Sequence, residues 1–235
     1  LYVVGSSALG DHRQHSDIDV IAFTADPTDA EVIEALESAH ETARIELGAD
    51  VVIDGPRLGW ADVSVPPMPA LRAWTLDGEF RFDGDCFVIN PVSWYVLDRY
   101  GIAIRGAPSS ELGVHVDAAE MQAYVREEVD TRWRTVGEQL RAALADPEST
   151  AFDAASVEWA ALGVVRPLYV AMTGDVAPKT VAGEWAAEQL PEHAAILHAA
   201  IELRRHGVEG SVDRDAVEAV ADLVDDVVAH ITSAD

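Results

Sequence analysis

The chain opens with an apolar run that ends in a Gly-Ser pair, Leu1–Ser7 (LYVVGSS), and continues after a polar stretch with Ser16–Ile21 (SDIDVI). The first segment predicts a strand that ends in a turn at Gly5, and the second predicts a strand over its apolar residues. Side chains two residues apart on a strand lie on the same face, so Asp17 and Asp19 present two carboxylates to one side. Such carboxylates repel one another unless a cation lies between them.

This pair of carboxylates predicts a Mg²⁺ site. Mg²⁺ takes hard oxygen ligands and is held through one or two carboxylates together with substrate phosphates. Backbone N–H groups of the turn at Gly5, and the hydroxyl of Ser6, can bind phosphate oxygens. Asp50 precedes a third apolar run and could complete a cluster of three carboxylates. A polar turn beside an acidic strand edge is the alternative to a metal site.

Residue patterns predict further elements in the front half of the chain. Thr28 and Glu31 have the spacing of a capping box, which predicts that a helix begins there. The third strand is expected over 49–53, and the proline-rich residues 56–70 are expected to form a loop. Asn90, which a proline follows, predicts the start of another helix.

From about residue 108 the pattern becomes helical throughout. Apolar residues at helical spacing predict helices over 121–144, 154–172, 180–189, 192–206 and 213–231. We therefore expect an α+β chain with two domains: a mixed sheet with flanking helices over residues 1–110, and an all-helical bundle over residues 111–235.

The charge balance excludes two classes of partner. The chain has 42 Asp and Glu residues against 16 Lys and Arg residues, which gives a formal net charge of -26 at pH 7. Binding to nucleic acid requires a basic surface, and so does docking on an anionic membrane, so neither is expected. A cationic small-molecule substrate fits this charge, and so does an acidic surface that only keeps the protein in solution.

The cysteine content and the lack of long apolar runs indicate the cellular compartment in which the protein is expected. Cys86 is the only cysteine, which excludes an internal disulfide and a cysteine zinc site. No apolar run approaches the ~20 residues of a membrane span, and the first residues do not resemble a signal peptide. We expect a cytoplasmic protein, and a monomer. Because Leu1 already begins a strand, we also expect that a leading segment precedes it.

The front segments, residues 1–7 and 16–20, resemble the signature of the DNA polymerase beta-like nucleotidyltransferase superfamily. Within it, the chain is similar to the streptomycin/spectinomycin adenylyltransferases, the aminoglycoside adenylyltransferases of bacterial antibiotic resistance. The more specific likeness lies in the back half, in Thr173–Lys179 (TGDVAPK), Glu184–Ala186 (EWA) and Leu190–Pro191 (LP). It covers nearly the whole chain, except a short helix that the family has before its first strand.

The resemblance implies a nucleotidyltransferase domain followed by a helical domain that contacts ATP and the acceptor, with ATP and Mg²⁺ bound between the two. Asp17 and Asp19 match the metal ligands of the family. Asp50 stands where the family has a glutamate that serves as general base, so the resemblance makes it both the catalytic base and a metal ligand. An aspartate can abstract the same proton with a side chain that is one methylene shorter.

The resemblance also implies an ATP site, formed by Gly5, Ser6, Ser16, Arg166, Lys179 and Arg205. Arg205 stands where the family has a tyrosine. Lys179 has support of its own, because it is the only lysine in a chain whose other fifteen basic residues are arginines. A lysine acts on phosphate as a compact point charge on a flexible stem. Chance placement in an arginine-rich sequence is the alternative.

For the acceptor, the resemblance implies contacts at Glu79, Phe80 and Ser156. Phe80 follows a Gly-Glu pair, as an aromatic residue does in the family, and Ser156 stands where the family has an acidic residue. The implied reaction is transfer of AMP from ATP to a hydroxyl of a small cationic acceptor, such as an aminoglycoside or aminocyclitol, with release of pyrophosphate. The alternatives are a non-catalytic member of this fold and an enzyme that adenylylates a protein.

Overall fold

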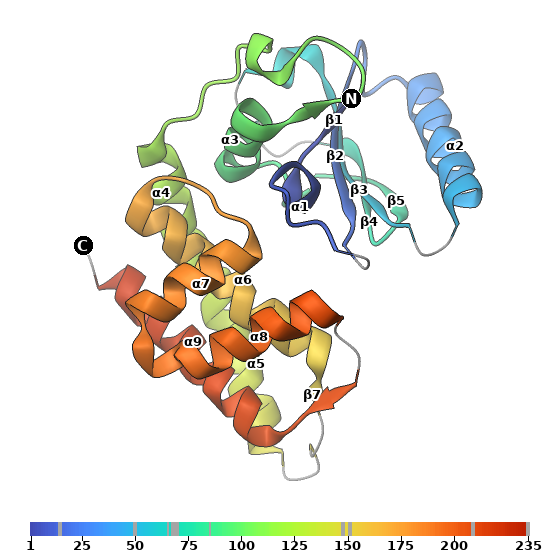
Figure 1. The fold of residues 1–235 in the computed structure, drawn as a ribbon. Coiled ribbons are helices and arrows are strands. Elements are labelled where there is room, and N and C mark those ends of the chain that lie inside the picture. The colour runs from blue at the N-terminus through green and yellow to red at the C-terminus, as the bar shows by residue number, and fades with distance from the viewer. Residues whose placement is uncertain are drawn as a thin grey trace. The chain divides into compact units, whose positions relative to one another are not determined.

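A computed structural model gives the structure of the chain over residues 1–13, 16–48, 51–64, 66, 71–84, 86–146, 149, 152–207 and 210–233. The chain forms two compact units, Leu1–Asp117 and Ala118–Asp235, each with its own core (Figure 1). No helix in the described part of the chain combines the length and the apolar content that a membrane span requires.

A six-stranded mixed sheet organises the first unit, in the order β5-β4-β3-β2-β1-β6. The strands are β1 (Tyr2–Val3), β2 (Ile18–Thr24), β3 (Ile53–Gly59), β4 (Arg72–Leu76), β5 (Glu79–Asp83) and β6 (Ile102–Ala103). β2 and β3 run parallel, whereas every other neighbouring pair is antiparallel. β2 therefore lies inside the sheet, with a partner on each side.

The first unit also holds the helices α1 (Gly5–Ala8), α2 (Ala30–Leu47) and α3 (Pro91–Tyr100), and the short 3₁₀ turns η1 (Trp60–Asp62) and η2 (Ser109–Glu111). The predicted start of α3 is confirmed, because the Asn90 side chain accepts a hydrogen bond from the N–H of Ser93 (2.9 Å). The predicted capping box before α2 is wrong. Asp29 caps that helix by accepting from the N–H groups of Glu31 (2.9 Å) and Val32 (3.1 Å).

β3 begins at Ile53, the last residue of the strand predicted over 49–53, and runs through Asp54 and Gly55 to Gly59, so the first part of the predicted loop is strand. Residues 49 and 50 of that prediction lie outside the described residues. No turn forms at Gly55, because β3 there lies against β2: a Cβ atom on Gly55 would lie 1.9 Å from the carbonyl oxygen of Val20. The buried carboxylate of Asp54 instead caps the turn between β4 and β5, accepting from the N–H groups of Asp77 (2.8 Å) and Gly78 (3.1 Å).

The second unit is a helical bundle, as predicted, and this confirms the α+β class. Its elements are α4 (Ala118–Glu128), the π-helical segment η3 (Val129–Trp133), α5 (Arg134–Ala145), β7 (Phe152–Asp153), α6 (Ala154–Thr173), α7 (Lys179–Gln189), η4 (Pro191–His193), α8 (Ala194–His206), β8 (Ser211–Val212) and α9 (Arg214–Thr232). α6 packs against α4, α7, α8 and α9 and buries most of its residues, so it is the central helix.

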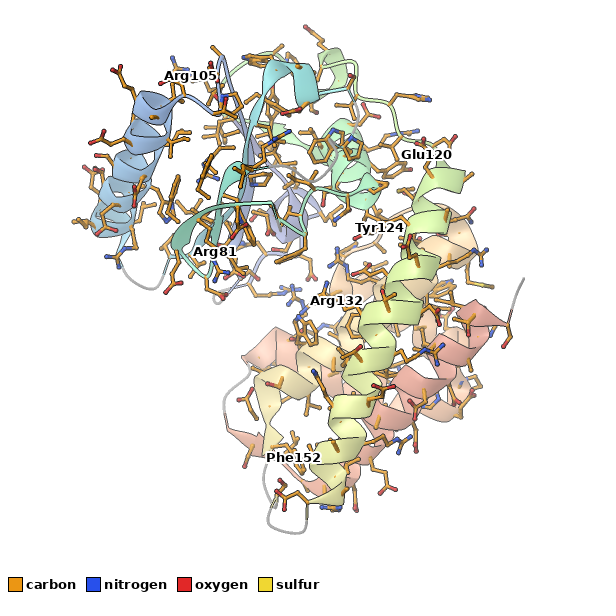
Figure 2. All side chains as sticks on the ribbon, turned by 180° about the vertical axis from the view of Figure 1, so that it is seen from behind. Arg81, Arg105, Glu120, Tyr124, Arg132 and Phe152 are labelled. Carbon is orange, nitrogen blue, oxygen red and sulfur yellow. The ribbon has the colours of Figure 1, made fainter. Side chains whose placement is uncertain are left out.

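The helix predicted over 121–144 is one rod made of α4, η3 and α5, on which Figure 2 shows Tyr124 and Arg132. The π-helical segment ends in Trp133, whose ring stacks on that of Trp159 from α6 with centroids 5.3 Å apart. A Cβ atom on Gly163 would lie 2.5 Å from the Trp133 ring, so α6 has glycine where this indole packs. The π-helical segment thus ends with the Trp133 side chain directed into the bundle.

Candidate active site

Two carboxylates lie at the start of β2, the interior strand of the first unit. Asp17 directly precedes the strand and is exposed, whereas Asp19 is its second residue and is half-buried. On one side, the carbonyl of Asp19 accepts a hydrogen bond from the N–H of Val4 (2.9 Å). On the other side, the N–H of Ile18 donates to the carbonyl of Val52 (2.8 Å). The backbone that carries the two carboxylates is therefore fixed from both sides.

The carboxylate of Asp19 lies directly against the backbone of Gly5. Gly5 has a φ of +58°, and a Cβ atom on it would lie 1.9 Å from Asp19 Oδ2. No side chain fits in that space, and the left-handed backbone favours glycine independently of it. The Gly-Ser pair at the end of β1 is thus in contact with one of the two predicted metal ligands.

The loop that leads into β2 begins with a helical turn, α1, instead of the expected tight turn. The Ser16 hydroxyl accepts a hydrogen bond from the N–H of Arg13 (3.0 Å), and the Arg13 guanidinium pairs with the buried carboxylate of Asp11 (2.9 Å). Ser6 and Ser16 lie near the two ends of this loop. Their contact with a nucleotide stays a prediction.

Two basic side chains pair with one buried carboxylate in the second unit, and a third lies close enough to act on one of them. Glu158 of α6 is only 5% exposed. Its two oxygens lie 3.4 Å from Lys179 Nζ and 3.4 Å from a guanidinium nitrogen of Arg204. Arg166, about two turns further along α6, adds its positive charge to the field at Lys179. Lys179 of α7 and Arg204 of α8 thus meet at a carboxylate of α6, and Arg166 of the same helix adds a third positive charge near Lys179.

The surroundings of Lys179 favour a bound anion. Burial lowers the pKa of its ammonium group below the usual value, the neighbouring guanidinium groups lower it further, and Glu158 acts in the opposite direction. Lys179 is also the first residue of α7, whose first turn contains no acidic residue and whose N-cap, Pro178, offers no side-chain acceptor. The N–H groups and the dipole of such a helix start attract negative charge, as a phosphate would supply.

The two units match two different family models. Residues 1–54 match the nucleotidyltransferase domain, and residues 132–230 match the C-terminal domain of aminoglycoside adenylyltransferases. The chain thus joins a nucleotidyltransferase domain to a C-terminal domain of the aminoglycoside adenylyltransferase type. It is an enzyme, a nucleotidyltransferase. The comparison with curated proteins gave no match.

Both candidate sites of this nucleotidyltransferase lie within the matched residues. The Asp17/Asp19 pair and Gly5 fall in the nucleotidyltransferase domain, at a strand that has a partner on each side. The group of cations around Glu158 falls in the C-terminal domain. Each matched domain therefore contributes one charged site, acidic in the first and mainly basic in the second.

The structure separates Arg205 from the other predicted ATP-binding residues of the helical unit. Its guanidinium is exposed and forms ion pairs with Glu184 and with Glu202 (3.0 Å). Its neighbour Arg204 joins Lys179 at Glu158 instead. Successive helical residues are about 100° apart around the axis, so only one of the two arginines can face α6. Arg205 was predicted because it stands where the family has a tyrosine, and that alignment does not point to Arg204.

The remaining predicted site residues stay predictions. Asp50, the expected base, lies outside the described residues. Glu79 and Phe80 lie on β5, where Glu79 is exposed and Phe80 is half-buried. Ser156 lies in the first turn of α6, and both its N–H and its hydroxyl donate to the capping carboxylate of Asp153 at 2.8 Å. Its hydroxyl thus has a structural partner in addition to the predicted role.

Replacing Gly5 by Ala should displace the carboxylate of Asp19 and lower the enzyme's activity. An alanine forced to adopt the positive φ of Gly5 should by itself lower the free energy of unfolding by about 1–2 kcal/mol. Urea unfolding checks that cost, and steady-state kinetics check the activity. Gly10→Ala is the matched control: its φ is also positive (+73°), but nothing lies within 4 Å of its Cβ position. If the two variants are equally active, catalysis does not require the close contact between Gly5 and Asp19.

Proposed function

We propose that the enzyme transfers the AMP group of ATP to a hydroxyl of a small cationic acceptor, of the aminoglycoside or aminocyclitol class, and releases pyrophosphate. The observation that carries this proposal is the pairing of Lys179 and Arg204 with Glu158 at the start of α7, with the charge of Arg166 acting on Lys179. Desolvated cations beside a helix N-terminus fit the β- and γ-phosphates of a nucleoside triphosphate. Glu158 holds the cations in place before the nucleotide binds.

The donors at the start of β2 fit a magnesium ion. Asp17 and Asp19 supply hard carboxylate oxygens from one strand face, and the exposure of Asp17 leaves room for water and phosphate oxygens as further ligands. When bound, Mg²⁺ supplies positive charge that offsets the negative charge developing on the leaving pyrophosphate. We assign Asp17 and Asp19 to hold it, with Asp50 as the third carboxylate.

The transfer requires a base, an oriented triphosphate and a path for the leaving group. The acceptor oxygen forms a bond to the α-phosphorus while the bond from that phosphorus to the bridging oxygen of the β-phosphate breaks. The pyrophosphate leaves with the electron pair, and the hydroxyl proton passes to a carboxylate, which we assign to Asp50. Lys179 and Arg204 bind the phosphates that leave, so the charge that accumulates there in the transition state meets fixed cations.

The charge of the chain selects the acceptor class. With a formal net charge of -26, the protein attracts cations and repels anions. A neutral sugar would gain nothing from this field, whereas an aminocyclitol that carries ammonium groups would be attracted. We therefore expect acceptor affinity to fall as salt rises, because charge attraction is screened beyond about 8–10 Å at physiological ionic strength.

Pyrophosphate release from each of the four nucleoside triphosphates, with Mg²⁺ and a panel of acceptors, tests this function. The panel contains aminoglycosides, aminocyclitols and linear polyamines, with neutral sugars as controls, and mass spectrometry follows the acceptor. We expect release with ATP only, and a cationic product that is heavier by one adenylyl group. Transfer of another nucleotide, equal use of a neutral sugar, or adenylylation of protein alone would contradict the proposal.

A further inference from the structure

An imidazole and two carboxylates meet in the second unit where η4 packs beside α9, in a cluster that the proposed reaction does not use. Glu192, His193 and Asp226 each offer a donor atom, and these atoms all lie within 4.8 Å of one another. The His193 side chain is almost fully buried, and its Nε2 lies 2.8 Å from Asp226 Oδ2. Two of the donors come from the turn η4 and one from the last helix, so the cluster joins two elements that are distant in the sequence.

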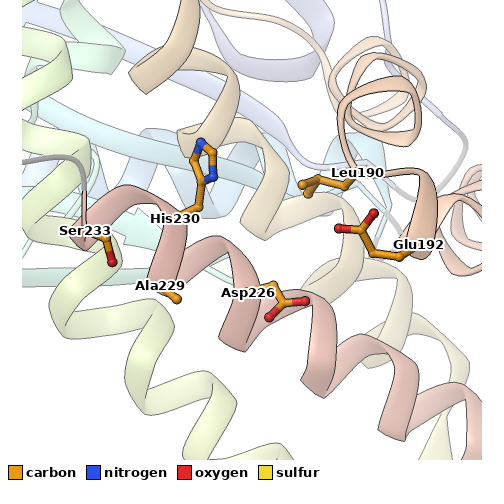
Figure 3. A pocket seen from close by; sticks show the side chains of 6 residues that line it. All are labelled: Leu190, Glu192, Asp226, Ala229, His230 and Ser233. Atoms are coloured by element: carbon orange, nitrogen blue, oxygen red, sulfur yellow. The ribbon is translucent and has the colours of Figure 1, made fainter.

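The same two carboxylates line an open pocket of about 510 Å³, shown in Figure 3. Leu190, Ala229 and Ser233 form part of its wall, and His230 adds a second imidazole one turn after Asp226 on α9. The pocket has room for several water molecules, each of which needs about 30 Å³. A metal ion with protein ligands on one side needs such room on the other.

A pair between His193 and Asp226 accounts for only part of this geometry. Among the described residues, Glu192 forms neither an ion pair nor a side-chain hydrogen bond, yet its carboxylate lies beside that of Asp226. Two carboxylates side by side repel one another unless a cation lies between them. A divalent ion within reach of both, and of the imidazole nitrogen, satisfies all three groups together.

We propose that Glu192, His193 and Asp226 bind a divalent transition-metal ion, Zn²⁺ being the best fit, with pocket water completing the coordination. Imidazole nitrogen with carboxylate oxygens suits Zn²⁺ and related ions, whereas Mg²⁺ takes oxygen ligands. The site is distinct from the Asp17/Asp19 pair, which lies in the other unit. An ion here links η4 to α9 and therefore stabilises the helical unit, and its binding does not depend on the proposed reaction.

Calorimetric titration of the full chain with Zn²⁺, in a buffer that does not chelate metals, tests the site. We expect one saturable site that Asp226→Asn and Glu192→Gln each weaken by at least about 10-fold, the usual minimum for loss of a supporting group. The amide oxygen introduced by Asp226→Asn would still accept the hydrogen bond from His193, so this variant keeps the packing of the buried ring. The matched control is His206→Gln, which removes an exposed imidazole that pairs with one carboxylate, Glu202 (3.1 Å), and is expected to leave zinc affinity unchanged.

Thermal unfolding gives a second measurement of the same site. At a free Zn²⁺ concentration about 100 times the Kd, Tm of the full wild-type chain should rise by about 5–10 °C, and Tm of Asp226→Asn should not. Absence of saturable zinc binding by the wild type would overturn the proposal. Unchanged affinity in Asp226→Asn and Glu192→Gln would overturn it too, since a metal bound elsewhere would survive both substitutions.

Discussion

Asp17→Asn and Asp19→Asn should each lower the rate of nucleotidyl transfer by about 10³-fold or more, while the protein remains folded. Such a loss corresponds to about 4 kcal/mol of transition-state stabilisation, which is the scale of the contribution of a bound metal ion. An amide has the shape of the carboxylate but not its charge, so each variant should weaken the binding of the metal without disturbing the structure. Asp19→Asn retains the contact with Gly5, and the side chain of Asp17→Asn remains exposed. Single-turnover kinetics at saturating ATP and Mg²⁺ measure the effect.

Stability separates this effect from a structural one. In the metal-free protein the two carboxylates repel one another, so removal of one charge should leave Tm unchanged or raise it slightly. Glu34→Gln, which removes an exposed carboxylate from α2, controls for the change in net charge and should keep full activity. If either aspartate variant turns over at the wild-type rate, or if its loss of activity follows a loss of fold, the pair does not hold the metal.

The fold was predictable wherever a local pattern agreed with the tertiary packing. The apolar periodicity of the back half gave its helices, because each of them buries one face in the bundle around α6. The pattern failed at Asp54 and Gly55. These residue types are typical of a turn, but the sheet uses Gly55 for a close approach to Val20 and uses Asp54 to cap a distant hairpin. Neither of these long-range contacts is visible in the sequence around them.

The candidate site was predictable to the same degree. Asp17 and Asp19 follow from strand alternation, which is a local property. The partners of Lys179 cannot be predicted from a local pattern, because Glu158 and Arg204 come from two other helices. One signal for Glu158 was present: it is an acidic residue in the apolar stretch of the central helix, and a buried acid of this kind usually has a cationic partner. The choice between Arg204 and Arg205 required the rotation of α8, which the sequence does not fix.

Lys179→Ala should raise the dissociation constant of ATP by about 10- to 100-fold, or roughly 1.4–3 kcal/mol, as expected for the loss of a charge-assisted contact to phosphate. The desolvated ammonium group loses its penalty of burial when an anion binds, so this residue should contribute more than an exposed cation would. Calorimetry with Mg²⁺-ATP measures the change. Lys179→Arg restores the charge but not the compact shape, and it should recover only part of the affinity.

Arg204→Ala and Arg205→Ala form a matched pair that tests the position of the triphosphate. The two arginines are adjacent on α8 and change the net charge equally, but only Arg204 lies at Glu158, whereas Arg205 pairs with Glu184 and Glu202 on the surface. We expect Arg204→Ala to weaken ATP binding about as much as Lys179→Ala, and Arg205→Ala to change it less than about twofold, as is usual for exposed ion pairs. If Arg205→Ala has the larger effect, ATP binds on the outer face of α8. Unchanged affinity in all three alanine variants would remove the cations around Glu158 from the ATP site.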